Sequence, residues 1–204
     1  MLKRRTLFFV ALLAVTGCTQ TARLLNPPDQ VAEPVGLVAV LPIDRDPGAT
    51  PERLPPDVER IVTAHIYGVL ADSSHWRFVP DVTVGDALTE VNPVYVQDDR
   101  AQALGEAVEA DAVICGTVSR FVERDGSDFG ADEPASVAFR LKLVSTASGE
   151  VLWEGEFDET QQSLSGNLLN FWQFWRGGPR WFSAAEFSRM GVERLLEDLE
   201  ARTP

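Results

Sequence analysis

The sequence predicts an α/β (α+β) protein with a single domain, in which helices pack on a mixed β-sheet that includes an antiparallel C-terminal hairpin. Strand-like and helix-like segments follow one another between residues 36 and 204, in the order strand, helix, strand, helices, three strands and helix. The last two strand-like segments alternate apolar and polar residues on either side of a short turn. A chain of 204 residues without an internal repeat suits one domain with a substantial core.

The first predicted strand is the apolar run LVAVLPI at 37–43, whose branched residues suit a strand buried on both faces. After a polar loop, the segment 57–71 repeats apolar residues at helical spacing and follows two prolines. This segment is therefore predicted as an amphipathic helix that Asp57 opens. The predicted apolar stripe consists of Val58, Ile61, Val62, His65, Ile66 and Val69.

The middle of the chain contains shorter predicted elements. Residues 76–79 have the composition of a strand, and residues 81–90 and 100–109 have that of helices with small apolar faces. Residues 111–122 form a second, mostly buried strand, and an acidic loop with two glycines follows at 123–133.

The predicted hairpin joins 137–143 to 151–157 through the turn 145–150. Both strands are expected to be half-buried, because apolar residues alternate with charged ones along each of them. The residues predicted to face the core are Val137, Phe139, Leu141, Leu143, Val151, Trp153 and Phe157.

The last predicted element is a helix that begins after Ser183. Ser183 and Glu186 have the spacing of a capping box, and Phe182 and Phe187 occupy the two positions of a hydrophobic staple. The predicted apolar face of this helix consists of Val192, Leu195, Leu196 and Leu199.

The beginning of the chain predicts export from the cytoplasm. Three basic residues precede an apolar run from Leu7 to Val15, which is too short to span a bilayer. The sequence Val15-Thr16-Gly17-Cys18 resembles a bacterial lipobox, which implies that residues 1–17 are a signal peptide and that Cys18 is lipidated. Residues 18–35 contain three prolines and no period, and are predicted as a flexible tether to a globular periplasmic domain at 36–204.

The charge of the mature chain excludes some partners. The formal charge is −13, and removal of Lys3, Arg4 and Arg5 with the signal moves it to −16. Such a protein is not expected to bind nucleic acid, and attachment to a membrane must come from acyl chains on Cys18. Thr19 follows this cysteine, which for lipoproteins of this kind implies the outer membrane, facing the periplasm. Cys115 is the other cysteine, so no intramolecular disulfide is expected.

Three blocks of the sequence resemble a bacterial lipoprotein superfamily. They are VAVLP at 38–42, LGEAVEADAVICGTV at 104–118, and the hairpin that ends in SGEVLW at 148–153. This superfamily includes the curli-secretion lipoprotein, activator lipoproteins of penicillin-binding proteins, short neisserial-type surface lipoproteins and, more distantly, the amino-terminal domain of the Tol-system β-propeller protein. The resemblance implies an envelope lipoprotein that works through protein partners.

Signs of catalysis or metal binding are weak in the sequence. His65 and His75 are the only histidines; His65 lies on an apolar stripe, and neither has the spacing of a zinc site. Cys115 lies within an apolar run and is predicted as a small core residue. The acidic residues of 123–133 do not have the spacing of a calcium-binding loop. No metal, cofactor or enzymatic activity is therefore predicted.

A stretch rich in aromatic residues precedes the last helix. Residues 169–182, LNFWQFWRGGPRWF, contain three of the five tryptophans and three of the eleven phenylalanines of the chain. Part of this stretch has helical spacing and is predicted to complete the core. Phe174, Arg176, Arg180 and Trp181 do not share that stripe, and are predicted to form the rim of a site for a partner protein.

These observations favour a lipid-anchored, non-catalytic protein-interaction module in envelope biogenesis or assembly. Its expected partners are the membrane and a periplasmic or outer-membrane protein, and a homo-oligomer remains an alternative. Two other functions remain open: a subunit of an outer-membrane secretion or transport complex, and an envelope hydrolase. A transmembrane barrel would need amphipathic strands beyond the core sheet, and the sequence contains no surplus alternating hairpin.

Overall fold

The structure is a computed structural model that describes residues 23–24, 31, 34–73, 75–91, 96–127, 130–161 and 181–203. Its strands are β1 (Arg23–Leu24), β2 (Leu37–Val40), β3 (Asp44–Arg45), β4 (Arg77–Phe78), β5 (Ala112–Val122), β6 (Asp125–Ser127), β7 (Gly130–Glu133), β8 (Ser136–Ser145) and β9 (Val151–Thr160). Its helices are the 3-10 turn η1 (Pro51–Arg53) and α1 (Val58–Asp72), α2 (Asp81–Ala87), α3 (Gln97–Ala107) and α5 (Ala184–Arg202).

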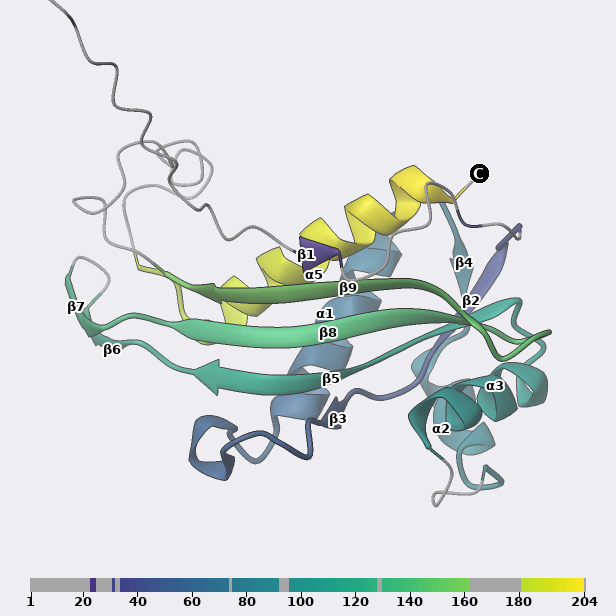
Figure 1. The fold of residues 1–204 in the computed structure, drawn as a ribbon, viewed down its shortest axis with the longest axis horizontal. Helices are drawn as coiled ribbons and strands as arrows, with labels where there is room; N and C mark the ends of the chain where they lie inside the picture. Colours follow the sequence, from purple (N-terminus) through teal and green to yellow (C-terminus); the bar gives the residue numbers. More distant parts are fainter. Residues whose placement is uncertain are drawn as a thin grey trace, which may run out of the picture.

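A seven-stranded mixed sheet forms the centre of the molecule, with the order β1-β9-β8-β5-β2-β4 and with β3 also paired to β5 (Figure 1). Strand β2 runs parallel to β4 and β5, whereas β5, β8 and β9 run antiparallel to one another. The predicted fold class is therefore confirmed. Among the described residues, no helix is both long and apolar enough to cross a membrane.

The helices cover the two faces of the sheet unequally. Helices α1 and α5 pack together on one face, and their apolar side chains share a core cluster with β2, β5, β8 and β9. Helices α2 and α3 lie on the other face at one end of the sheet, beside the β8–β9 turn, where they enclose a smaller cluster (Figure 1). Trp153, Phe139 and Phe157 are the largest fully buried side chains of the described residues.

Asp111 lies in the block 104–118, on which the family resemblance partly rests, and it makes hydrogen bonds to two other segments of the chain. Its Oδ2 accepts hydrogen bonds from the backbone N–H groups of Gly36, at 2.9 Å, and Leu37, at 2.7 Å. Its own N–H donates to the Leu37 carbonyl, and its carbonyl accepts from the N–H of Thr146. One residue thus joins the starts of β2 and β5 to the turn between β8 and β9.

Two glycines of the same block allow close packing. A Cβ at Gly105 would lie 2.2 Å from Thr146 Oγ1, and a Cβ at Gly116 would lie 2.0 Å from the backbone oxygen of Arg140. Both distances are far below van der Waals contact, so any side chain would push α3 or β5 away from its neighbours. The block therefore specifies how α3 and β5 approach β8 and its turn.

Helix α1 confirms the predicted period but not the predicted cap. Its buried residues are Val58, Val62, Ile66 and Leu70, while Ile61, His65 and Val69 are half-buried. Asp57 occupies the N-cap position, but its carboxylate makes no capping hydrogen bond. The carboxylate instead accepts a hydrogen bond from Arg60 Nη2 at 2.9 Å. The prediction that Asp57 caps this helix is therefore wrong.

The hairpin of β8 and β9 has the predicted position, with one correction. Trp153 and Phe157 are almost fully buried, as the alternation predicts. Val151 does not face the core as predicted, because it is 41% exposed. The register shifts between Leu143 and Val144, so that Trp153 pairs with Leu143 but Val151 pairs with Val144. This irregularity interrupts the alternation next to the turn.

The predicted acidic loop at 123–133 contains the small antiparallel sheet of β6 and β7, which extends β5 and β8 beyond the main sheet. Asp125 pairs with Glu133 and Ser127 with Gly130. Gly126 has a φ of 117° at a register shift, a conformation that favours glycine and that permits the bulge. Pattern analysis missed these strands because they contain few apolar residues.

The final helix confirms its sequence signals. The Ser183 side chain accepts a hydrogen bond from the Glu186 N–H, and the Glu186 side chain accepts one from the Ser183 N–H, which completes the capping box. Phe187 is buried and Phe182 packs against the core. The predicted apolar face is fully buried: Val192, Leu195, Leu196 and Leu199.

Parts of the predicted tether contact the domain. Arg23 and Leu24 form β1 and pair antiparallel with Glu156 and Gly155 of β9. Val31 is 2% exposed in the main core, and its N–H donates to the Arg202 carbonyl at 2.9 Å. Pattern analysis missed these contacts, because two-residue pairings and single buried residues have no sequence period.

Candidate functional site

The predicted partner site lies mostly outside the described residues. Phe174, Arg176 and Arg180 belong to the undescribed segment 162–180, and the predicted lipidation site Cys18 is also outside the described residues. Trp181 is described: it is half-buried and lies two residues before the N-cap of α5. The structure therefore places one of the four predicted rim residues.

The described residues on either side of the segment 162–180 lie next to each other in the fold. The N–H of Phe182 donates to Gln161 Oε1 at 2.9 Å, and the N–H of Gln161 donates to the Ala135 carbonyl at 2.9 Å. Gln161 is 6% exposed. This buried amide holds the chain that leaves β9 against the chain that enters α5, and so positions Trp181 at this end of the sheet.

Backbone N–H groups in the first turn of α5 have hydrogen-bond acceptors within the protein. Besides the capping box, the N–H of Ala184 donates to both carboxylate oxygens of Glu123, at 3.1 and 3.2 Å. The positive end of the helix dipole thus faces a carboxylate of the strand connection after β5. The helix terminus is therefore already occupied and does not offer a site for an anionic ligand.

Ion pairs cross the sheet on the face opposite α1 and α5. Arg120 Nη2 on β5 contacts Asp158 on β9, and its Nε donates to Ser136 Oγ on β8 at 2.6 Å. Arg140 on β8 contacts Glu154 and Glu156 on β9, at 3.5 and 3.2 Å. We call this set the charge ladder. Its acidic and basic side chains neutralise one another across neighbouring strands.

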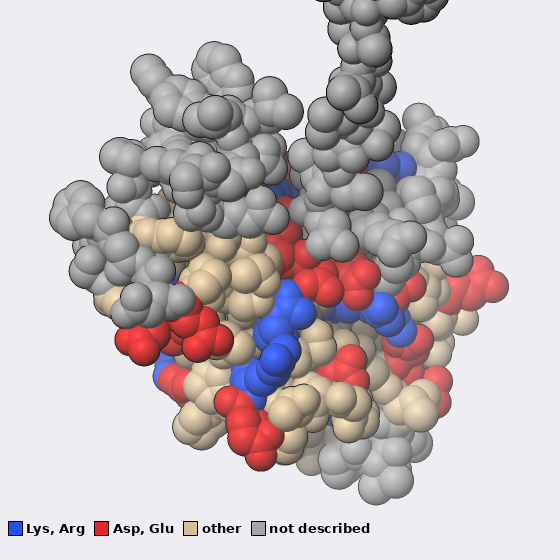
Figure 2. Space-filling model, turned by 60° about the vertical axis from the view of Figure 1, so that its left-hand side comes forward, with Lys and Arg blue, Asp and Glu red and all other residues tan. Residues whose placement is uncertain are grey.

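The distribution of charge agrees with an internally paired surface. Figure 2 shows basic side chains next to acidic ones over the described part of one face. Partly exposed ion pairs of this kind contribute little to stability, about 0–1 kcal/mol each. The charge ladder forms a hydrated surface, and its carboxylates already have basic partners.

A second polar network fastens α3 to the sheet. Gln97 Nε2 donates to Asp44 Oδ2 at 3.0 Å and to the Gly116 carbonyl at 2.7 Å. Arg100 also pairs with Asp44, at 3.1 Å, and Asp98 pairs with Lys142 of β8 at 3.0 Å. Each polar group of this network has a partner in the fold, so its role is to hold the helix.

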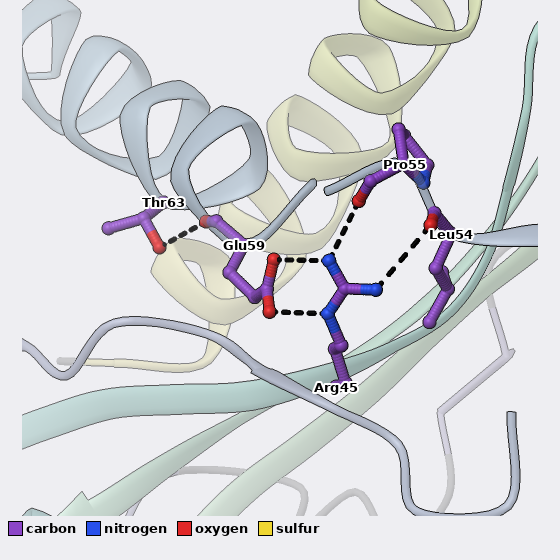
Figure 3. Close-up of polar contacts among 5 residues, drawn as sticks. All are labelled: Arg45, Leu54, Pro55, Glu59 and Thr63. Carbon is purple, nitrogen blue, oxygen red and sulfur yellow. Dashed lines mark hydrogen bonds and ion pairs between the residues drawn. The ribbon is translucent and has the colours of Figure 1, made fainter. Parts of the chain in front are cut away.

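The connection between β3 and α1 is held by Arg45 (Figure 3). Its guanidinium donates two hydrogen bonds to the Glu59 carboxylate and further bonds to the carbonyls of Leu54 and Pro55. The hydrogen bonds from Arg45 lower the pKa of Glu59, against a smaller opposite effect of burial. All donors shown point to groups of the same chain, so this network is structural.

Among the described residues, the arrangement that most resembles a catalytic pair is that of His65 on α1 and Ser188 on α5. Ser188 Oγ lies 2.8 Å from His65 Nδ1 and donates to the Ala185 carbonyl at 3.0 Å. Ser188 is 0% exposed in the packed interface of α1 and α5. A nucleophile must reach its substrate, and this hydroxyl has no exposed surface. The pair is an interhelical hydrogen bond.

His65 predicts a pH dependence of stability. Burial, and secondarily the charge of Arg189, lower the pKa of His65 below its ordinary 6.5. The folded state therefore binds a proton on His65 more weakly than the unfolded state does. The contribution of neutral His65 to the free energy of unfolding is complete above the pKa of the unfolded state, and it is lost as the pH falls below that pKa. We expect the urea midpoint of the wild type to decrease between about pH 7.5 and 5.5 more steeply than that of His65→Gln. Equal slopes would show that His65 does not titrate across folding.

The other described residues that could act as nucleophiles or metal ligands are either buried or far from one another. Burial raises the pKa of the Cys115 thiol to about 12, so this side chain is a core residue and not a nucleophile at neutral pH. His75 is exposed and its ring packs edge-on against Trp76. Within the described residues, no three His, Cys, Asp or Glu side chains come together in a way that could hold a metal ion.

Sequence reasoning did not identify several residues whose side chains make these contacts. The ladder contacts between Arg140 and the acidic residues of β9 follow from the hairpin register, and opposite charges on the two predicted strands were a usable signal. Glu123 and Gln161 act on groups 61 and 21 residues away in the chain. No local pattern identifies such partners, so they required the tertiary structure.

The chain matches no protein-family model, and no curated protein matches its sequence. It is similar to the solved structure of a PelC dodecamer, a point variant of the protein from Paraburkholderia phytofirmans, with 14% identity, a TM-score of 0.51 and coverage of 88% of this chain and 98% of that one. It is also similar to the hypothetical protein CT253 from Chlamydia trachomatis, with 15% identity, a TM-score of 0.50 and coverage of 83% and 98%. The lipoprotein GNA1162 from Neisseria meningitidis has 17% identity, a TM-score of 0.48 and coverage of 69% and 91%. The first two similarities show the fold.

Proposed function

We propose that this protein is a lipoprotein of the bacterial envelope, anchored at Cys18, that acts as a non-catalytic interaction module in envelope biogenesis or assembly. The lipobox, the absence of a usable catalytic set among the described residues and the family resemblance support this proposal. The mature protein is assigned to the periplasmic side of the outer membrane, because Thr19 follows the lipidated cysteine.

The observation that best supports a docking role is the closure of the segment 162–180 at its two ends. The N–H of Phe182 donates to the Gln161 side chain, so the described chain leaves β9 and enters α5 at one place. We propose that Phe174, Arg176, Arg180 and Trp181 form the rim of the partner site. Aromatic and arginine side chains are enriched among the residues that dominate binding energy in protein interfaces.

The double variant Phe174→Ser/Trp181→Ser tests the docking site. We expect it to lose the complex that crosslinking in living cells captures with the wild type, while the folded domain persists. A matched control is Val82→Ser/Val96→Ser, which also removes two exposed apolar side chains, 71% and 67% exposed, from α2 and the start of α3. This control should keep the complex. Survival of the complex in the first variant, or unfolding of that variant, contradicts the assignment.

A second candidate function is a subunit of an outer-membrane secretion or transport complex. The PelC structure of similar fold is a dodecamer, which favours assembly of several copies as the alternative. The same crosslinking experiment separates the two candidates by the mass of the partner. A product at multiples of the chain mass supports an oligomeric complex, whereas a product of another mass supports a docking partner.

A further inference from the structure

Three consecutive peptide groups at the start of α5 are held by side chains. The N–H of Phe182 donates to Gln161 Oε1 at 2.9 Å. The N–H of Ala184 donates to both carboxylate oxygens of Glu123, at 3.1 and 3.2 Å. Between them, the N–H of Ser183 is held by the capping box of α5 itself. The chain that enters α5 is therefore fixed from the end of β9, from the helix and from the connection after β5.

The other helices that the structure describes begin without such contacts. The N-cap residues of η1, α1, α2 and α3 make no side-chain capping hydrogen bond. The first backbone N–H groups of a helix have no acceptor within the helix, and water commonly serves them. The buried apolar face of α5 already holds this helix on the sheet. The additional bonds from Gln161 and Glu123 therefore act mainly on the direction of the chain before the helix.

The bond from Phe182 to Gln161 fixes the peptide group that begins at Trp181. A peptide group is planar, and this plane contains the Cα and carbonyl of Trp181 together with the N–H of Phe182. Because Gln161 holds the N–H, it also fixes the direction of the Trp181 carbonyl. Gln161 is itself held in place, since it is 6% exposed and its own N–H donates to the Ala135 carbonyl at 2.9 Å.

The two acceptor residues continue strands that are joined to each other at this end of the sheet. Thr160, which precedes Gln161, has its hydroxyl 2.6 Å from Ser136 Oγ. Ser136 Oγ also accepts from Arg120 Nε at 2.6 Å. Glu123 directly follows β5, whose last residue pairs with Ser136. The start of α5 is thus positioned relative to the sheet, beside the end of β9 (Figure 1).

Trp181 is suited to contact a partner from this position. It is half-buried, so part of its surface is covered by the protein and part is accessible. A tryptophan whose backbone is fixed before binding loses less conformational freedom in a complex than one on a freely moving chain. Tryptophan is also enriched among the residues that dominate binding energy in protein interfaces.

We propose that Glu123 and Gln161 are positioning residues of the partner site, which hold the start of α5 so that Trp181 is presented with a fixed backbone direction. The positioning of Trp181 is carried by the contacts described above. Its effect on a partner protein rests on the docking function proposed above. Glu123 is exposed, so its side chain can be exchanged without disturbing the core.

Fluorine NMR of the full chain labelled with 5-fluorotryptophan tests the positioning without a partner. The resonance of Trp181 is assigned by its loss in Trp181→Phe. Glu123→Met removes the acceptor of the Ala184 N–H and is expected to shift or broaden this resonance, while that of the buried Trp153 stays in place. Glu123→Gln keeps an oxygen acceptor and should restore the wild-type resonance. An unchanged Trp181 resonance in Glu123→Met, or no restoration in Glu123→Gln, overturns the positioning role.

Two further variants make this test specific. Gln161→Met removes the acceptor of the Phe182 N–H at a similar side-chain length, and is expected to displace the same resonance. Glu106→Met makes the same chemical change as Glu123→Met at an exposed position of α3, and should leave the resonance unchanged. Displacement by Glu106→Met shows an effect of charge alone and overturns the assignment. If Gln161→Met unfolds, the variants of the exposed Glu123 decide the result.

Crosslinking in living cells tests the effect on the partner. The yield of the crosslinked complex is expected to fall about tenfold in Glu123→Met, and Glu123→Gln should restore it. If Trp181→Ser loses the complex but Glu123→Met keeps it, the positioning residues do not serve the partner site and the proposal is wrong. If the Trp181 resonance moves in Glu123→Met and neither variant loses the complex, the docking function is wrong instead.

Discussion

Trp153→Ala is expected to lower the free energy of unfolding by about 3–5 kcal/mol, the range for truncation of a large buried aromatic side chain. Trp153 is 1% exposed, and its indole Nε1–H donates to Asp198 Oδ2 of α5 at 3.1 Å. Its ring also packs over Gly155, where an added Cβ would lie 2.6 Å from Cζ2 of Trp153. The substitution therefore removes both the packing and the polar contact between β9 and α5. Urea unfolding at neutral pH measures the change.

Two variants on the same strand make this result specific. Trp153→Phe keeps most of the ring but removes the N–H, so its effect is expected to lie between those of the wild type and alanine. Val151→Ala, at a position that is 41% exposed, should change the free energy by no more than about 0.5 kcal/mol. If Trp153→Ala unfolds at the same urea concentration as the wild type, the register of β9 is wrong.

Cys18→Ala is expected to abolish lipidation and attachment to the membrane through acyl chains. The chain is acidic, with a formal charge of −13 before any processing, so electrostatic attraction to anionic lipids cannot replace acyl chains. The variant should remain uncleaved or be released as a soluble protein, and it should not incorporate a palmitate analogue. Fractionation of cells after metabolic labelling measures both properties.

The control for this experiment is the other cysteine. Cys115→Ala removes a thiol that is fully buried in the smaller core, so membrane attachment and labelling should be unchanged. A wild-type chain that takes up no label, or a Cys18→Ala chain that stays in the membrane fraction and keeps its label, would contradict the proposed anchor.

Much of the fold followed from local patterns in the sequence. The capping box of Ser183 and Glu186 and the alternation around Trp153 each depend on residues close together in the chain, and both are present in the structure. A local interaction also explains why the predicted cap of α1 is wrong. Asp57 has a suitable position for a cap, but Arg60 is close enough to take its carboxylate. The partner role of Phe174, Arg176, Arg180 and Trp181 is a prediction from composition, and Trp181 is the one of them that the structure describes.

The sequence by itself determined the fold class, the order of most elements, the apolar face of α5 and the buried positions Trp153 and Phe157 of β9, because hydrophobic period and capping are local properties. The tertiary structure alone decided which distant groups meet. Asp111 reaches Gly36 across 75 residues, His65 meets Ser188 across 123, and Arg23 pairs with Glu156. These contacts arise when the sheet order brings remote segments together, and no periodicity along the chain encodes them.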